Sequence, residues 1–331
     1  MQRRTLGESG PEVGAIGLGC MGMSDFYGPA DRAESVATIH AALESGATLL
    51  DTGDFYGSGH NEILICEALR GRRREDYVLS VKFGALRDPA GVFVGYDCRP
   101  VAVKNFLAYS LKRLGVDHID VYRPARLDPE VPIEDTVGAI ADMIKAGYVR
   151  AIGLSEVSTS TIRRAAAVHP IADLQIEYSL IMRMIEIDIL PACRELGIGI
   201  TAYGVLARGL ISGHWSKARA NEKDFRGFSS RFSGDNLHHN LALVETLRKV
   251  AASRDVSVAA TAVAWVLAQG KNIVPLVGAR KREQWAESSA ADAIVLSEAD
   301  LAAIEQAIPP GAAKGDRYPV QAMAHLDSEK R

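Results

Sequence analysis

Cysteine is scarce in this sequence, and its placement excludes one class of protein. The four cysteines, Cys20, Cys66, Cys98 and Cys193, lie far apart without a CxxC pair. This spacing excludes a disulfide-rich secreted scaffold and is typical of a reduced cytoplasmic protein. Long apolar runs are lacking as well. No run reaches the length of a membrane span, and the first ten residues lack the apolar core of a signal peptide. We therefore expect a cytoplasmic protein.

An excess of charge of one sign is also lacking. The chain carries 38 Lys and Arg against 41 Asp and Glu, a net charge of -3 at pH 7. This balance gives no support to a nucleic acid or a membrane surface as a partner, so we expect neither. Hydrophobic residues make up 47% and charged residues 24% of the 331 residues, which is typical of a soluble globular protein with a large core. The oligomeric state stays open.

The chain has a regular alternation of short apolar runs and amphipathic stretches. Eight apolar runs predict strands, at 15–20, 48–51, 77–83, 118–122, 149–155, 174–178, 199–204 and 273–278. Between them, apolar residues at helical spacing predict helices at 31–46, 61–70, 103–115, 133–146, 159–168 and 186–195. Strands that alternate with helices pair in parallel. At this length we therefore expect an α/β fold, a single (β/α)8 TIM barrel over 1–331.

Three segments lie outside the alternation. Residues 1–14 predict an N-terminal β-hairpin, 205–238 a long βα loop that is functional or disordered, and 309–331 an irregular C-terminal tail. Extra helices are predicted near 239–253, 257–269, 281–290 and 297–308. Asp31 is predicted to cap the first helix of the alternation, with Glu34 completing a capping box.

Asp51, Tyr56 and Lys82 form a candidate proton-donor set. Asp51 ends the strand TLLD, Tyr56 follows in the next loop, and Lys82 lies near the end of the strand YVLSVKF. Barrel enzymes carry their chemistry at the C-terminal ends of the strands, so we expect the three side chains to meet there. A Lys ammonium lowers the pKa of a neighbouring phenol from its usual value of about 10, and an Asp keeps that Lys charged. Taken singly, each residue has a structural reading: a buried cation, a turn cap and loop packing.

Two tempting motifs do not predict sites. Gly17, Gly19 and Gly22 match G-x-G-x-x-G after a strand, but the following helix begins only near Asp31. A dinucleotide-binding Rossmann unit needs the third glycine in the opening turn of that helix. The pair His238-His239 consists of adjacent residues that do not share a face, so we expect no metal.

Seven blocks of the sequence resemble the aldo-keto reductases, in order and over nearly the whole chain. They are GLGCMGMSDFYG (17–28), DTGDFYGSGHNE (51–62), SVKFG (80–84), GLSE (153–156), QIEYS (175–179), AYGVLARG (202–209) and VPLVGARKREQW (274–285). The group that includes pyridoxal reductase and perakine reductase is the most similar. The resemblance implies an NADPH-dependent oxidoreductase that reduces an aldehyde or ketone to an alcohol, with the cofactor in the mouth of the barrel.

The resemblance also implies residue roles. Tyr56 would be the general acid, Lys82 would lower its pKa and Asp51 would be the partner of Lys82. The nicotinamide carboxamide would be held by Ser155, Glu156 and Gln175, and Tyr203 would stack on the nicotinamide ring. Further cofactor contacts would come from Gly204, Leu206, Arg208, Gly278, Arg280, Arg282, Gln284 and Glu287. The basic run 280–282 at a helix start also suits a 2′-phosphate by itself, which favours NADPH over NADH, although a solvated helix face would look the same.

One position departs from the family pattern. After the fourth strand the family usually has a His that polarises the substrate carbonyl, and this chain reads YRPARLDP with Ala125 at that position. Loss of one preorganised donor typically costs about a hundredfold in rate. Arg123 or Arg126 could supply a donor instead. Ala125 also motivates an alternative, a low-turnover NADPH-binding sensor or regulatory subunit, against which the intact set of Asp51, Tyr56 and Lys82 argues.

Overall fold

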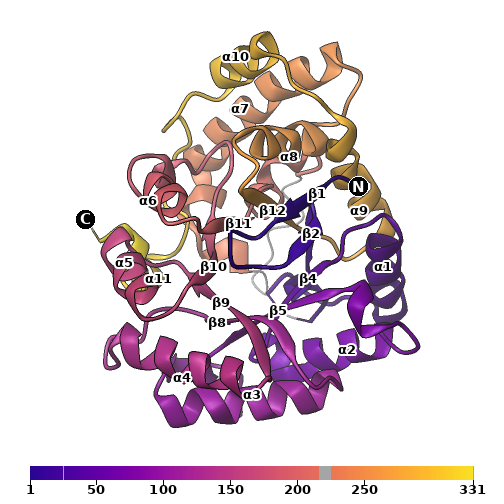
Figure 1. Cartoon of the computed structure of the whole chain (residues 1–331). Coiled ribbons are helices and arrows are strands. Elements are labelled where there is room, and N and C mark those ends of the chain that lie inside the picture. The colour runs from indigo at the N-terminus through magenta and orange to yellow at the C-terminus, as the bar shows by residue number, and fades with distance from the viewer. Residues whose placement is uncertain (25, 216–224, 331) are drawn as a thin grey trace.

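The computed structural model describes the chain except residues 25, 216–224 and 331. Part of the predicted loop 205–238, one residue of the block 17–28 and the last residue of the tail therefore lie outside the described residues. Eight parallel strands close into a barrel (Figure 1). They are β3 (Gly17–Gly19), β4 (Leu49–Gly53), β5 (Val78–Phe83), β8 (Ile119–Pro124), β9 (Val149–Ser155), β10 (Ile171–Glu177), β11 (Gly199–Tyr203) and β12 (Ile273–Gly278), and β12 pairs with β3. The predicted (β/α)8 barrel is confirmed.

Helices surround the barrel in Figure 1. They are α1 (Arg32–Glu44), α2 (His60–Ala68), α3 (Pro100–Leu114), α4 (Ile133–Lys145), α5 (Thr159–Val168), α6 (Ile189–Glu195), α7 (Gly234–Ser253), α8 (Val258–Ala268), α9 (Arg282–Ser289) and α10 (Glu298–Ala307). Each predicted helix is present. The start of α7 was predicted five residues too late, because its polar first turn carries no apolar signal.

Two elements were not predicted. A hairpin of β6 (Ala85–Arg87) and β7 (Phe93–Tyr96) follows β5, and a short helix, α11 (Val320–Met323), lies in the tail that the sequence predicted as irregular. Both are short, and none of their residues is fully buried. A strand of three or four residues with no buried face has no alternation of apolar and polar residues that would predict it.

The predicted capping box of α1 is half right. The Asp31 carboxylate accepts a hydrogen bond from the Glu34 backbone N–H at 2.7 Å, as an N-cap does. The Glu34 carboxylate, however, binds the Arg282 guanidinium of α9 at 2.9 Å instead of returning to the cap. The ion pair with a distant helix replaces the local contact, so this prediction was wrong for Glu34.

The N-terminal hairpin of β1 (Arg3–Thr5) and β2 (Glu12–Gly14) lies across the N-terminal end of the barrel (Figure 1). Leu6 and Val13 from this hairpin join a buried apolar cluster with Leu49, Val121 and other residues of the strands. Side chains along a strand alternate between its two faces, so the residues two positions further along, such as Asp51 after Leu49, also point into the barrel. The apolar layer therefore closes one end, and the polar residues lie toward the other end, which we call the mouth.

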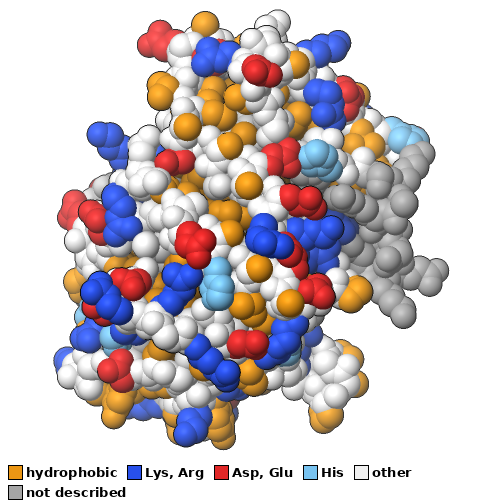
Figure 2. All heavy atoms as spheres, turned by 90° about the vertical axis from the view of Figure 1, so that its right-hand side faces the viewer, with side chains coloured by type: hydrophobic (Ala, Val, Ile, Leu, Met, Phe, Trp, Pro, Cys, Tyr) orange, Lys and Arg blue, Asp and Glu red, His pale blue; other side chains and the backbone are white. Residues whose placement is uncertain are grey.

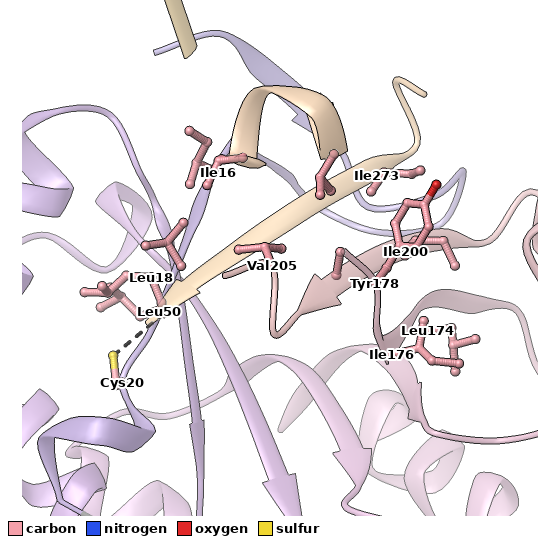
Figure 3. Close-up of a cluster of buried hydrophobic side chains, with 14 of the residues drawn as sticks. Ile16, Leu18, Cys20, Leu50, Leu174, Ile176, Tyr178, Ile200, Val205 and Ile273 are labelled. Atoms are coloured by element: carbon pink, nitrogen blue, oxygen red, sulfur yellow. Dashed lines mark hydrogen bonds between the residues drawn. The ribbon is translucent and has the colours of Figure 1, made fainter. Parts of the chain in front are cut away.

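A larger core lies between the strands and the helices. Figure 3 shows part of it, with Leu18 and Leu50 from β3 and β4 at one side and Leu174 and Ile176 from β10 at the other. The strand β3 is followed by a 3-10 turn, η1 (Met21–Met23), and not by a helix, so the glycines before it do not form a Rossmann turn. The rejection of that motif is confirmed.

The surface carries charges of both signs. On the face that Figure 2 shows, acidic and basic side chains are interspersed. Among the described residues no single helix is long and apolar enough to cross a membrane, and only α7 and α8 together, bent by 86°, pass that test.

Candidate active site

The strands β4 and β5 bring Asp51 and Lys82 together inside the barrel. The Lys82 Nζ lies 2.5 Å from Asp51 Oδ1, and both side chains are about 95% buried. The second oxygen of Asp51 accepts hydrogen bonds from Ser80 Oγ at 2.8 Å and from Gln175 Nε2 at 2.7 Å. A buried ion pair is stable only when its remaining hydrogen-bonding atoms are satisfied, and Ser80 and Gln175 do this for the carboxylate.

Tyr56 lies beside this pair. It begins η2 (Tyr56–Gly59), a tight turn in which Gly57 and Ser58 have positive φ angles of 55° and 53°. The turn reverses the chain so that the Tyr56 ring faces the barrel, where Lys82 Nζ lies 5.3 Å from the ring centroid. The ring is about 95% buried. The structure thus brings together the three residues Asp51, Tyr56 and Lys82.

The electrostatics of Tyr56 differ from the expectation. Burial and the Asp51 carboxylate raise the pKa of the Tyr56 phenol well above its usual value, and the Arg126 guanidinium acts in the opposite direction. Burial also lowers the pKa of Lys82, although Asp51 counteracts this. Because Asp51 neutralises Lys82 at hydrogen-bond distance, the pair presents little net charge to the phenol. The lowering of the Tyr56 pKa expected from Lys82 is not seen in this structure.

Arg123 is held inside the barrel, in register with Lys82 on the neighbouring strand. Its guanidinium, fully buried, donates to Asp173 Oδ2 and to Ser80 Oγ, both at 2.9 Å. Gly153 makes room for this pair, since a Cβ there would lie 2.9 Å from the Arg123 Cζ and 2.7 Å from Asp173 Oδ1. Arg123 therefore supports Asp51 through Ser80 and does not reach the mouth.

Arg126 points toward the mouth instead. It follows Ala125, which is buried at the end of β8, and it is half-buried. Its guanidinium donates to Ser155 Oγ at 3.3 Å, to the Ala125 carbonyl at 2.6 Å and to Tyr318 Oη at 3.5 Å. These partners are neutral, and among the described residues Arg126 forms no ion pair.

The other residues expected around the carboxamide lie at the ends of β9 and β10. Ser155 ends β9, next to Gln175 in the register of the two strands, and both are buried. Tyr203 ends β11, and its hydroxyl donates to Glu156 Oε1 at 2.6 Å and contacts Tyr318 Oη at 2.8 Å. The side chains of Ser155, Glu156, Gln175 and Tyr203 therefore share one side of the mouth.

Glu156 has other partners than the expected carboxamide. The Arg317 guanidinium donates to both carboxylate oxygens, at 2.8 Å and 2.6 Å. Oε1 also accepts from Tyr203 and from the Glu177 backbone N–H, and Oε2 accepts from Ser328 Oγ. A carboxylate offers about four lone-pair sites, which these donors occupy. In this structure the Glu156 carboxylate is therefore bound by groups of the chain itself.

The C-terminal tail closes over this part of the mouth, which the sequence did not predict. Arg317 also reaches Glu177 Oε2 at 3.4 Å, and Arg208, which was expected to bind the cofactor, pairs with the same carboxylate at 3.5 Å. The Arg208 guanidinium lies 4.3 Å from the centroid of the Tyr318 ring and donates to the Arg317 carbonyl. The signal in the sequence was an Arg-Tyr pair in an otherwise polar tail, at 317–318.

The remaining residues expected at the cofactor lie after β11 and β12. They are Gly204 with a φ of 66°, Leu206, Gly278, Arg280, Arg282, Gln284 and Glu287. Arg280 donates to the Tyr27 carbonyl at 2.8 Å and through its backbone N–H to Gln284 at 3.0 Å. Glu287 accepts from His214, and both line a pocket at the surface.

This arrangement fits a nicotinamide dinucleotide. A Cβ at Gly278 would meet no atom within 4 Å, so the end of β12 is open to a ligand. Basic side chains lie at the first turn of α9, where a helix N-terminus favours phosphate. Tyr203 offers an aromatic ring at the mouth beside the Asp51–Lys82 pair.

Asp54 is a buried carboxyl group that the ion pair does not use. Burial and the neighbouring Glu62 raise the pKa of Asp54 to about 8, although Arg113 lowers it. In the unfolded chain the Asp54 carboxyl group ionises near pH 4, so the native protein should lose stability as the pH rises from about 4 to about 8. We expect the free energy of unfolding of Asp54→Asn, relative to that of the native protein, to be higher at pH 9 than at pH 5 by about 1 kcal/mol or more. Urea denaturation at both pH values measures this. Asp142→Asn, on an exposed part of α4, is the control; an equal change in both variants would contradict this role of Asp54.

Comparisons with known proteins agree with this geometry. Residues 15–309 match the Aldo/keto reductase family. A protein from Glycine max named probable aldo-keto reductase 1 is 39% identical over 314 residues, which are 95% of this chain and 90% of that protein. The solved glycerol dehydrogenase of Gluconobacter oxydans superposes with a TM-score of 0.84 at 28% identity, over 99% of this chain and 97% of that one. A thermostable aldo-keto reductase, Tm1743, solved with the inhibitor epalrestat, gives 0.75 at 28% identity, over 93% and 100%. This chain therefore belongs to the aldo-keto reductase family of oxidoreductases.

Proposed function

We propose that this protein is an NADPH-dependent oxidoreductase that reduces an aldehyde or ketone to an alcohol, with Tyr56 as the proton donor. The observation that carries the proposal is the position of Tyr56 next to the buried Asp51–Lys82 pair at the barrel mouth of a member of this family. When bound, the cofactor supplies a hydride to the carbonyl carbon.

The residues of the chain handle the proton. The Tyr56 phenol donates it to the carbonyl oxygen, and the Lys82 ammonium, 5.3 Å from the ring centroid, would offset the negative charge that Asp51 presents to the phenolate that remains. Asp51 keeps Lys82 charged, since burial alone disfavours the ammonium. Ser80 and Gln175 fix the orientation of Asp51. The burial of this set excludes water, which strengthens each of these interactions.

The mouth also offers groups that would orient the nicotinamide. Ser155 is placed to bind the carboxamide, and the Tyr203 ring is placed to stack on the nicotinamide. Glu156 would act on the cofactor indirectly through Tyr203, because its carboxylate accepts a hydrogen bond from the Tyr203 hydroxyl at 2.6 Å. Gly204 and Leu206 would approach the pyrophosphate.

Arg280 and Arg282 would bind the 2′-phosphate that distinguishes NADPH from NADH. In this structure the Glu34 carboxylate accepts hydrogen bonds from the Arg282 guanidinium and from the Arg282 backbone N–H, two donors that also suit a phosphate. We expect Arg282→Gln to weaken NADPH binding about tenfold, because it removes a charge-assisted hydrogen bond at an exposed site. NADH binding should not change. Fluorescence titration with both cofactors measures this, with Arg163→Gln of α5 as the control; equal losses for both cofactors would contradict the assignment.

The proposed function is tested by NADPH consumption with a panel of aromatic and aliphatic aldehydes and ketones. Because one structural relative is named a glycerol dehydrogenase, the reverse reaction with NADP+ and glycerol belongs in the same panel. Turnover with NADPH supports the proposal. Tight NADPH binding without turnover of any substrate would favour the alternative of a sensor or regulatory subunit. Absence of NADPH binding would overturn the cofactor assignment itself.

A further inference from the structure

The mouth of the barrel contains a cation whose charge has no direct counterion among the described residues. Arg126 donates only to a hydroxyl, a phenol and a backbone carbonyl, as given above. Two other buried guanidiniums have direct counterions: Arg317 binds Glu156, and Arg123, inside the barrel, binds Asp173. A half-buried guanidinium with neutral partners keeps its charge and hydrogen-bonding capacity for a ligand.

The surroundings of Arg126 place it near the reacting atoms of the proposed reaction. Ser155 on one side is the group expected to hold the nicotinamide carboxamide, and the guanidinium donates to it at 3.3 Å. On the other side, the Tyr56 phenol is sensitive to the Arg126 charge, which opposes the rise in its pKa. A carbonyl oxygen that accepts a proton from Tyr56 therefore lies within the field of Arg126.

A cation at the mouth would replace a hydrogen-bond donor that position 125 does not supply. Ala125 at the end of β8 presents only a methyl group, so this position supplies no side-chain donor to the carbonyl oxygen. Tyr56 is one donor, and the oxygen of a carbonyl that receives a hydride develops negative charge, which a second preorganised donor stabilises. Arg123, the neighbouring candidate, is fully buried and binds Asp173 and Ser80 through its two terminal nitrogens.

We propose that Arg126 is a catalytic residue that donates a hydrogen bond to the substrate carbonyl oxygen, opposite Tyr56. This role rests on the proposed carbonyl reduction and adds to it the group that polarises the substrate. The bond to Tyr318, at 3.5 Å, is long enough to be exchanged for a bond to the substrate. The hydrogen bond to the Ala125 carbonyl, at 2.6 Å, keeps the guanidinium at the mouth.

The experiment compares Arg126→Met and Arg126→Lys with the native protein. The substrates are two aldehydes, neutral benzaldehyde and anionic 4-carboxybenzaldehyde. We expect Arg126→Met to lower kcat about a hundredfold for both, with the NADPH dissociation constant unchanged. Arg126→Lys should retain part of kcat, since it keeps the charge. The control Arg163→Met removes an exposed guanidinium of α5 that pairs with Glu195 and should leave kcat unchanged.

A second substitution separates catalysis from a structural role. If Arg126 acts on the carbonyl, Ala125→His should restore at least about tenfold of kcat in the Arg126→Met background and change the native enzyme much less. A loss of kcat that comes with weaker NADPH binding and no rescue by His would overturn the proposal, because Arg126 would then only hold Ser155 and Tyr318. A rise in KM that is confined to 4-carboxybenzaldehyde would also overturn the proposal, since Arg126 would then bind the substrate carboxylate.

The outcomes also distinguish this proposal from the proposed function. An active native enzyme whose kcat does not change in Arg126→Met would overturn the role of Arg126 alone. If the native protein turns over neither aldehyde nor any other substrate of the panel, the proposed carbonyl reduction is overturned, and the role of Arg126 with it.

Discussion

Replacing Tyr56 with Phe is expected to lower kcat between about a hundredfold and ten-thousandfold, which is the usual contribution of a positioned general acid. The substitution removes one hydroxyl group and leaves the ring, which packs edge-on against Phe55 with centroids 4.7 Å apart. The contact of the ring with Lys82 also remains. NADPH binding and the free energy of unfolding should therefore stay close to those of the native protein.

The measurement is steady-state NADPH oxidation with a neutral aldehyde, together with a titration of NADPH binding. Tyr109→Phe is the matched control, because Tyr109 lies on α3 with 56% of its surface exposed. A Tyr56→Phe variant that keeps native turnover would refute Tyr56 as the proton donor. The alternative of a cofactor-binding sensor predicts little turnover in the native protein and unchanged NADPH binding in Tyr56→Phe, since binding alone does not need the phenol hydroxyl.

Replacing Arg317 with Met is expected to destabilise the protein by about 3–5 kcal/mol, as when one partner of a buried ion pair is removed. Glu156 and Glu177 are almost completely buried, and Arg317 contacts both. Burial alone would raise the pKa of Glu156, but the Arg317 guanidinium and its hydrogen bonds hold that pKa well below its ordinary value. Without Arg317, the Glu156 carboxylate would remain buried with fewer donors.

The sign of the pH dependence follows from the lowered pKa. The contribution of Glu156 is fully present above the unfolded value near 4.5 and is lost as the pH falls toward the lower pKa of the folded state. Urea denaturation at pH 7 measures the loss in Arg317→Met, with Arg163→Met as the control. The double variant Glu156→Gln/Arg317→Met should recover part of the stability, because it removes the uncompensated charge. A double variant that is less stable than Arg317→Met would contradict this explanation.

The barrel could be predicted from the sequence because each strand is a short run whose inward and outward faces are both buried. Leu49 and Leu50 illustrate this, since one packs in the interior cluster and the other in the core beneath the helices. Such runs are apolar throughout, and the intervening helices carry apolar residues at a spacing of three and four. The hairpin of β6 and β7 has no fully buried residue and carries neither signal.

The proximity of the three proposed catalytic residues was predictable because each of them follows from a position in that pattern. Asp51 and Lys82 lie near the C-terminal ends of adjacent strands, whose side chains point to one mouth, and Tyr56 lies in the loop between them. The pattern does not predict which ion-pair partner each charged side chain has in the folded protein. Glu34 binds Arg282 instead of its own cap, and Glu156 binds the tail instead of remaining open.

The sequence by itself therefore determined the fold class, the family and the positions of Asp51, Tyr56 and Lys82, because these depend on local periodicity and on residues at strand ends. Only the tertiary structure decided that Arg123 binds Asp173 inside the barrel while Arg126 donates to Ser155 at the mouth, and that residues 317–318 close over Tyr203. These contacts join segments far apart in the chain. They depend on which buried charge compensates which, and no local pattern of residues contains that information.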